Sequence, residues 1–205
     1  GLEGDVVYHT EKGPQSAWIS IRLRSSDIAE DPLQRFIWER HTNRTGYRQQ
    51  RLAPEVLPDL ISSLGPFPGM HLKLYHTLED RRAIARLVYQ ADRTRVTTRG
   101  LHEQLMRMIR FSDEEERRTR DGFPLKNLEA GMGGELFLRM TRRWSIMRVC
   151  NRLGLSRIVP LMAYRGILNA SAVGLLKCPD MRAETLIDGG RALERLWLTV
   201  ARKGL

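Results

Sequence analysis

The chain has 205 residues and a mass of 23.7 kDa, and 41% of its residues are hydrophobic, enough to bury one core of domain size. Its 34 Lys and Arg outnumber 24 Asp and Glu, and the net charge of +10 makes polyanion binding an alternative to weigh. No run of about eighteen apolar residues and no apolar signal stretch occurs, which argues against a membrane span or a secretory signal. We expect a single cytoplasmic domain over residues 1–205.

The first third of the sequence predicts two strands and two helices. Polar and apolar residues alternate strictly from Ala17 to Arg24, which predicts a half-buried strand, and they alternate again from Met70 to His76. Pro32 suits the first turn of a short helix that runs to Glu39. A second helix, residues 53–64, has apolar residues at helical spacing and is stopped by a Gly-Pro-rich segment.

Helix signals dominate the middle of the chain. Thr77 begins a capping box, and an apolar stripe behind it predicts a helix to Ala91. A polar interval, Asp92–Arg99, separates this helix from a further helical pattern. Ser112 caps a short helix that ends at a Gly-Pro turn.

The last third combines a basic stripe, an apolar strand and the strongest helix. Leu136–Met147 predicts an amphipathic basic helix that packs, or covers a neighbouring subunit, in preference to lying on a membrane. Residues 172–178 predict a buried central strand. In the closing helix, from Ile187 to Leu205, we expect Gly190 and Ala201 to let another backbone approach closely.

The two cysteines predict neither a disulfide nor a metal site. Cys150 and Cys178 lie in apolar surroundings, without C-x-x-C or Cys/His spacing. We expect buried free thiols and no metal.

A compact basic motif provides the candidate site. In the stretch Glu39–Tyr47, Arg40 and Arg44 flank Thr42, each two residues away, where a short helix gives way to a polar turn. Two guanidinium groups beside one hydroxyl are a donor array suited to a phosphate monoester. The motif therefore predicts an anion as the ligand.

The same residues carry a family resemblance. The pattern Arg40-His41-Thr42-Asn43-Arg44, with Tyr47 three residues later, resembles the opening signature of the FMN-dependent nitroreductase superfamily, and the lead-in Asp31-Pro32-Leu33 resembles its Acg-like branch. The segment from Arg120 to Leu128, with its D-G-F-P-L turn, and the closing helix are also similar to that branch. The three segments occur in the family's order.

The resemblance implies an α+β fold with a central, mostly antiparallel sheet flanked by helices, in an intertwined homodimer. It also implies an oxidoreductase that passes hydride from NAD(P)H through FMN to a small electron-poor acceptor. By residue-wise transfer, Arg40, Thr42 and Arg44 bind the FMN phosphate. Because the flavin carries the chemistry, we assign no catalytic acid or base.

Two family features have no counterpart in this sequence. The flavin-contacting P-S-x-x-N-x-Q-P-W turn is absent, and the sequence stops before the family's loop over the flavin. We therefore expect either a piece of a longer protein or a member that has lost part of its site.

Two other functions stay open. A non-catalytic relative would bind flavin without turnover, or use the fold without flavin. A nucleic-acid-binding protein would explain the arginine content, although zinc spacing, an RNP-like strand and a plain helix-turn-helix pattern are missing. Hydrolase and P-loop motifs are absent as well.

Overall fold

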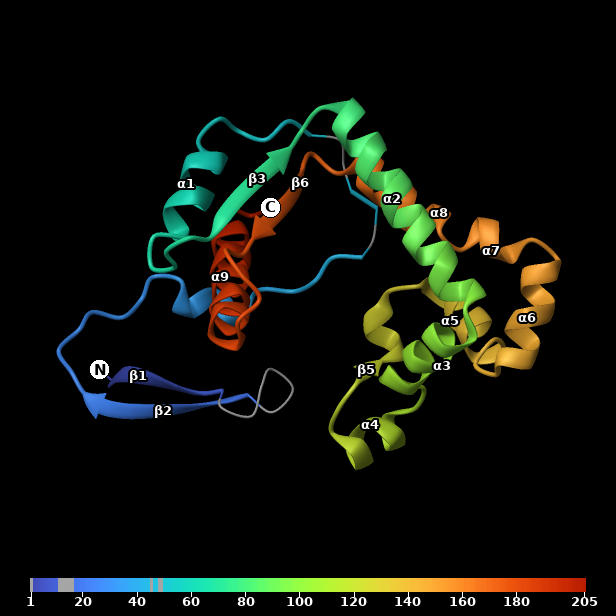
Figure 1. Ribbon diagram of the computed structural model, residues 1–205, viewed down its shortest axis with the longest axis horizontal. Coiled ribbons are helices and arrows are strands. Elements are labelled where there is room, and N and C mark those ends of the chain that lie inside the picture. Colours follow the sequence, from blue (N-terminus) through green and yellow to red (C-terminus); the bar gives the residue numbers. More distant parts are fainter. Residues whose placement is uncertain (1, 11–16, 45, 48–49) are drawn as a thin grey trace. The chain divides into compact units, whose positions relative to one another are not determined.

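The computed structural model describes residues 2–10, 17–44, 46–47 and 50–205, and it has an α+β fold in which helices predominate (Figure 1). The chain divides into two compact units. Unit 1 comprises residues 1–42, 52–75 and 174–205, and unit 2 comprises residues 43–51 and 76–173. The prediction of a single domain stays a prediction.

Unit 1 begins with an antiparallel hairpin of β1 (Leu2–His9) and β2 (Trp18–Ser25), in which Val6 lies opposite Ile21. The predicted strand is therefore confirmed, but its predicted burial is wrong. The apolar residues on β2 are exposed because no second layer covers them within unit 1; they are Ile19, Ile21 and Leu23.

The core of unit 1 lies between a helix pair and two strands. A 3-10 turn, η2 (Gln34–Ile37), replaces the predicted short helix. The other elements of this core are α1 (Val56–Ser63), β3 (His71–Tyr75), β6 (Val173–Lys177) and α9 (Ala183–Arg202). Strands β3 and β6 form a two-stranded sheet. The main cluster of buried apolar side chains is Val56, Leu60, Leu64, Phe67, Met70, Ala192 and Leu196.

Two sequence predictions for this core need correction. The sequence predicts a buried strand β6, but Gly174, Leu175 and Lys177 are exposed, because among the described strands β6 pairs with β3 alone. On α9, the close approach occurs at Gly189 and not at Gly190. A Cβ on Gly189 would lie 2.7 Å from the sulfur of Cys178, whereas Gly190 has open space around it.

Unit 2 consists mainly of helices, and two of them begin as predicted. Its helices are α2 (Leu78–Thr97), α3 (Arg99–Met108), α4 (Asp113–Thr119), α5 (Gly131–Met140), α6 (Trp144–Arg152), α7 (Leu155–Ile158) and α8 (Leu161–Asn169). Thr77 Oγ1 accepts a hydrogen bond from the Asp80 N–H at the start of α2, and Ser112 does the same for Glu115 at the start of α4. A short parallel pair, β4 (Ile109–Arg110) and β5 (Phe123–Pro124), precedes η3 (Leu125–Leu128).

The helical boundaries in unit 2 differ from the prediction at two places. The interval from Asp92 to Thr97 is helical and completes α2, because Val96 is buried and its carbonyl accepts a hydrogen bond from Asn151. The stripe predicted as one helix from Leu136 is broken between α5 and α6. Thr141, which is almost fully buried, ends α5 by donating to the Phe137 carbonyl.

The predicted α+β fold class is confirmed, but the nitroreductase-like arrangement within it is not. The structure is α+β, but the strands within the described ranges form three separate two-stranded sheets, so the expected central sheet is not found there. The intertwined dimer stays a prediction. In the part of the chain that the structure describes, no helix combines the length and the apolar character needed to cross a bilayer.

Candidate functional site

Arg40 is held against the closing helix α9. Its backbone N–H donates to the Phe36 carbonyl at 2.9 Å, which places the residue directly after the η2 turn. The centre of its guanidinium group lies 4.6 Å from the centroid of the Trp197 ring, and its Nε lies 3.1 Å from Glu194 Oε1. A cation–π contact and an ion pair thus fix the side chain on one face of α9.

The Arg40 guanidinium retains hydrogen-bonding capacity. Its Nε is buried, but the N–H is not aligned with the Glu194 carboxylate, so this donor has no hydrogen-bond partner among the described residues. A buried donor without a partner is costly, and a bound anion would satisfy it. The Arg40 side chain therefore fits the phosphate group that the sequence motif predicts.

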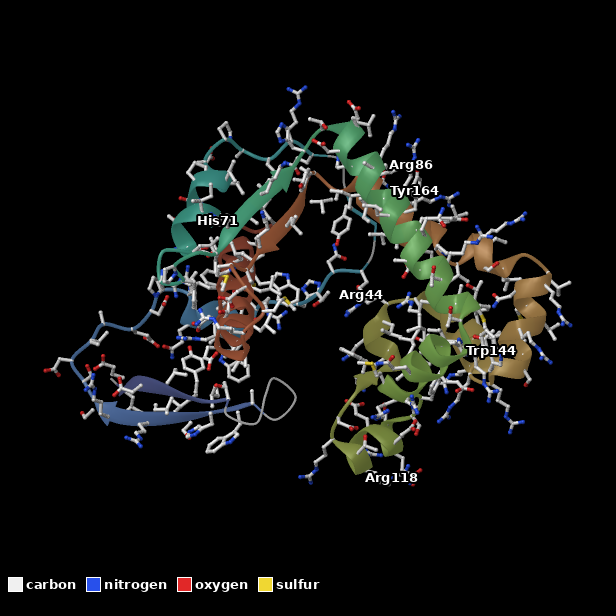
Figure 2. All side chains as sticks on the ribbon, viewed as in Figure 1. Arg44, His71, Arg86, Arg118, Trp144 and Tyr164 are labelled. Atoms are coloured by element: carbon white, nitrogen blue, oxygen red, sulfur yellow. The ribbon has the colours of Figure 1, made fainter. Side chains whose placement is uncertain are left out.

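Arg44 is held by the turn segment of unit 2. Its backbone N–H donates to Glu129 Oε2 at 2.7 Å, and its Nη1 donates to the Asn127 carbonyl at 2.9 Å. These contacts leave the outer part of the exposed guanidinium open to solvent (Figure 2). Thr42 is half-buried and belongs to unit 1, whereas Arg44 belongs to unit 2. Thr45, within the same stretch, lies outside the described residues.

The lead-in to the motif is also bound to α9. Arg195 Nη1 donates to Asp31 Oδ2 at 2.6 Å, and the Leu33 N–H donates to Asp31 Oδ1 at 2.9 Å. These hydrogen bonds favour the carboxylate, so the pKa of Asp31 lies below its usual value. Asp31 in the lead-in and Arg40 in the motif thus both bind residues of α9 that lie more than 150 positions away in the sequence.

Two surface hollows are less suited to an anion. One, of about 230 Å³, adjoins the lead-in, where Glu30 and Asp31 oppose Arg35. The other, of about 320 Å³, lies in unit 2 and balances three cations with three carboxylates: Arg110, Lys126, Arg139, Asp113, Glu116 and Glu135. Neither has the excess of donors that a phosphate requires.

The sequence predicts no metal site, neither at the cysteines nor at His71 and His76, which alternate onto opposite faces of a strand. Cys150 and Cys178 are free thiols, as predicted, but both are half-buried where burial was expected. Within the described ranges, no three His, Cys, Asp or Glu side chains lie close enough together to hold a metal ion.

Sequence reasoning missed two features of the site. The stacking of Arg40 on Trp197 joins residues 157 positions apart, and no local pattern indicates it. The segregation of charge between the units was also missed, although the absence of Asp and Glu between Glu135 and Asp180 is a signal that the sequence contains.

Comparison of the chain with protein-family models, with curated proteins and with solved structures gave no match.

Proposed function

We propose that this chain is an FMN-dependent oxidoreductase of the nitroreductase type, in which Arg40, Thr42 and Arg44 hold the FMN phosphate. The proposal is supported by the contacts of the two arginines. Arg40 packs on the closing helix through Trp197, and Arg44 bonds to Asn127 in the D-G-F-P-L segment. Each arginine of the first resembling segment therefore contacts one of the other two.

The proposed role of Arg40 is electrostatic. A phosphate would have to displace Glu194 from the ion pair, and the Glu194 side chain is 44% exposed. Surface ion pairs contribute only about 0–1 kcal/mol, so the carboxylate can turn into solvent at little cost while Trp197 keeps the guanidinium in place. The phosphate then satisfies the buried Nε–H. Thr42 adds a hydroxyl donor, and Arg44 adds a second charge.

Bound FMN would supply the redox chemistry, by accepting hydride from NAD(P)H and passing it to an electron-poor acceptor. The chain's own residues bind and orient the cofactor, and we assign none of them as an acid or a base. The proposal also includes the intertwined homodimer that the family resemblance implies.

The test is a titration of the chain with FMN and, separately, with riboflavin, followed by flavin fluorescence. Arg40→Ala is expected to weaken FMN binding about 10- to 100-fold, the equivalent of about 1.5–3 kcal/mol for hydrogen bonds to a charged group. Because riboflavin lacks the phosphate, its binding should not change. Thr42→Val and Arg44→Ala should act in the same direction.

Arg35→Ala is the matched control. It removes one positive charge and one guanidinium group, which lies 4.6 Å from the Phe36 ring in the same segment, but it leaves the motif intact. Its FMN affinity should equal that of the parent. A parent that binds no FMN, or an Arg40→Ala variant that loses FMN and riboflavin equally, would contradict the proposal.

The non-catalytic alternative has its own readout. Anaerobic addition of NADH or NADPH should bleach the visible absorbance of bound FMN in an oxidoreductase. A stoichiometric flavin that stays oxidised would identify a flavin-binding protein without this activity. Sedimentation velocity tests the dimer.

A further inference from the structure

The positive charge of this protein resides in unit 2. Unit 1 contains 12 Lys and Arg and 13 Asp and Glu, a net charge of −1, whereas unit 2 contains 22 and 11, a net charge of +11. Unit 2 therefore accounts for the whole excess of the chain. Such a local excess attracts polyanions much more strongly than the same charge spread evenly.

Within unit 2, the charge concentrates on the helices after Glu135. The residues from Leu136 to Val173 include no Asp or Glu. They include seven arginines: Arg139, Arg142, Arg143, Arg148, Arg152, Arg157 and Arg165. This stretch forms the second half of α5 and all of α6, α7 and α8.

Most of these arginines face solvent without a carboxylate partner. Arg142 lies 3.5 Å from Glu115 and over the Phe111 ring. The others are exposed and make no ion pair with any described residue. Figure 2 shows blue-tipped side chains extending outward from α6, near the labelled Trp144.

Helix α6 also carries an exposed aliphatic stripe. Its inner face is fixed to unit 2 by Met147, which is buried, and by Trp144, whose ring centroid lies 5.5 Å from that of His102. On the outer face, Ile146, Val149 and Leu153 are 40%, 52% and 77% exposed. Their spacing of three and four residues places them on one side of the helix.

A basic row lies beside the aliphatic stripe, since Arg148 and Arg152 are exposed and one helical turn apart. Arg148 and Arg152 each precede a member of the stripe in the sequence, Val149 and Leu153. The pattern continues after α6, where the exposed Ile158 follows Arg157. The ligand of this face must therefore offer anions and an apolar phase together.

We propose that this face of α6 and α7, the basic-aliphatic face, binds the surface of an anionic lipid bilayer. Lipid phosphates would pair with Arg148, Arg152 and Arg157, while Ile146, Val149 and Leu153 would enter the boundary with the acyl chains. From the sequence alone we expected no membrane partner and favoured packing of the Leu136–Met147 stripe over a membrane surface. The exposure of Ile146, Val149 and Leu153 in the structure is what points to a bilayer. This proposal does not depend on FMN binding.

Two other occupants fit the observations less well. A nucleic acid would offer phosphates to the arginines but no apolar partner to the aliphatic side chains. A second copy of the chain would place one unit of net charge +11 against another if the same face were used twice, which costs energy through like-charge repulsion. The bilayer satisfies both kinds of side chain.

The test is co-sedimentation of the full 205-residue chain with vesicles. The parent should bind vesicles of equal parts phosphatidylcholine and phosphatidylglycerol, and it should bind pure phosphatidylcholine much less. Arg148→Glu with Arg152→Glu should weaken binding at least about 20-fold, since each arginine near an anionic surface contributes roughly fivefold in affinity.

A matched charge control is available on α4. Arg117 and Arg118 are exposed, form no ion pair with described residues, and lie in the same unit (Figure 2 labels Arg118). Arg117→Glu with Arg118→Glu changes the net charge by the same amount, but it should weaken binding much less. Equal losses in the two double variants would mean that net charge alone drives binding, and the proposal would be wrong.

The apolar part is tested by Val149→Ser with Leu153→Ser, which leaves the charge unchanged. Vesicle binding should fall about tenfold or more, whereas retention on double-stranded RNA should not change. Undiminished vesicle binding by this double variant would overturn the proposal. If the two serines only convert a dimer of the chain to a monomer, the face binds a second copy and the proposal would again be wrong. If the Glu variants fail to fold, Arg148→Gln with Arg152→Gln should give the same direction with a smaller loss.

Discussion

The two units differ in how their charges are partnered. In unit 1, ion pairs connect segments far apart in the sequence, as in Arg40–Glu194, Arg195–Asp31 and Lys203–Asp59. In unit 2 the ion pairs between described residues span shorter stretches of sequence, from Arg99–Glu103 within one helix turn to Arg142–Glu115 across 27 residues. The ion pairs of unit 1 therefore help to hold distant segments together, whereas many cations of unit 2 face solvent.

This difference follows from chain connectivity. Unit 1 assembles three separate stretches of chain around α9, so its contacts close long loops at an entropic cost. Unit 2 is largely one continuous stretch, residues 76–173, and its helices form from local signals such as the Thr77 and Ser112 caps. Charged side chains of unit 2 that are not needed to hold distant segments together are therefore available to bind another molecule.

The largest expected effect tests whether the units unfold separately. Leu196→Ala empties part of the unit 1 core, and Ile109→Ala does the same in unit 2, where Ile109 is 1% exposed. Each should cost about 2–5 kcal/mol through lost burial and a cavity. Native-state hydrogen exchange should show the loss of protection confined to the unit that carries the substitution.

Leu87→Ala, at an exposed position on α2, is the control and should change stability by less than about 0.5 kcal/mol. If either core substitution lowers protection equally in both units, the chain unfolds as one cooperative body.

An effect of intermediate size concerns a long-range contact within unit 2. The Arg81 guanidinium donates to the Leu168 carbonyl at 2.9 Å and to the Ala170 carbonyl, so it joins α2 to the end of α8. Arg81→Met should lower the free energy of unfolding by about 1–3 kcal/mol, because both carbonyls lose a charged donor.

Arg82→Met is the neighbouring control, since Arg82 is exposed and makes no ion pair with the described residues. Urea denaturation should give a lower free energy of unfolding for Arg81→Met than for Arg82→Met. Equal destabilisation would show that lost charge matters and the α2–α8 connection does not.

The smallest expected effect depends on pH and belongs to unit 1. The Arg195 guanidinium and the Leu33 N–H lower the pKa of Asp31, so its contribution to stability is present above the unfolded pKa of about 3.9 and is lost as the pH falls through the folded pKa. Because the pair is partly exposed, Asp31→Asn should cost only about 0.2–1 kcal/mol at pH 7.

The difference between Asp31→Asn and the parent should disappear in acid, which unfolding curves measured across the acidic range can show. A difference that does not shrink as the pH falls below the unfolded pKa of about 3.9 would assign the effect to the Asp31–Leu33 turn and not to the charge.

The sequence motif selected the candidate residues Arg40, Thr42 and Arg44, but it could not indicate their partners. Arg40 contacts Trp197 and Glu194 because α9 packs beside the η2 turn, and that packing depends on Leu33, Phe36 and Leu198. The role of the three residues in binding FMN stays a prediction.

By itself, the sequence determined the type of several elements and, where a cap is present, the residue at which they begin. The caps at Thr77 and Ser112, the spacing of Val56 and Leu60, and the alternation in β3 act over a few residues, so they could be recognised without the fold.

Only the tertiary structure decided which of those elements are covered. The sequence predicted a half-buried strand at β2 and a buried strand at β6, but each lies in a two-stranded sheet and keeps exposed apolar side chains. Gly189, and not Gly190, meets Cys178 because the face of α9 that turns inward is set by its neighbours. Burial and close approach depend on a second segment distant in the sequence, whereas caps and periodicity do not.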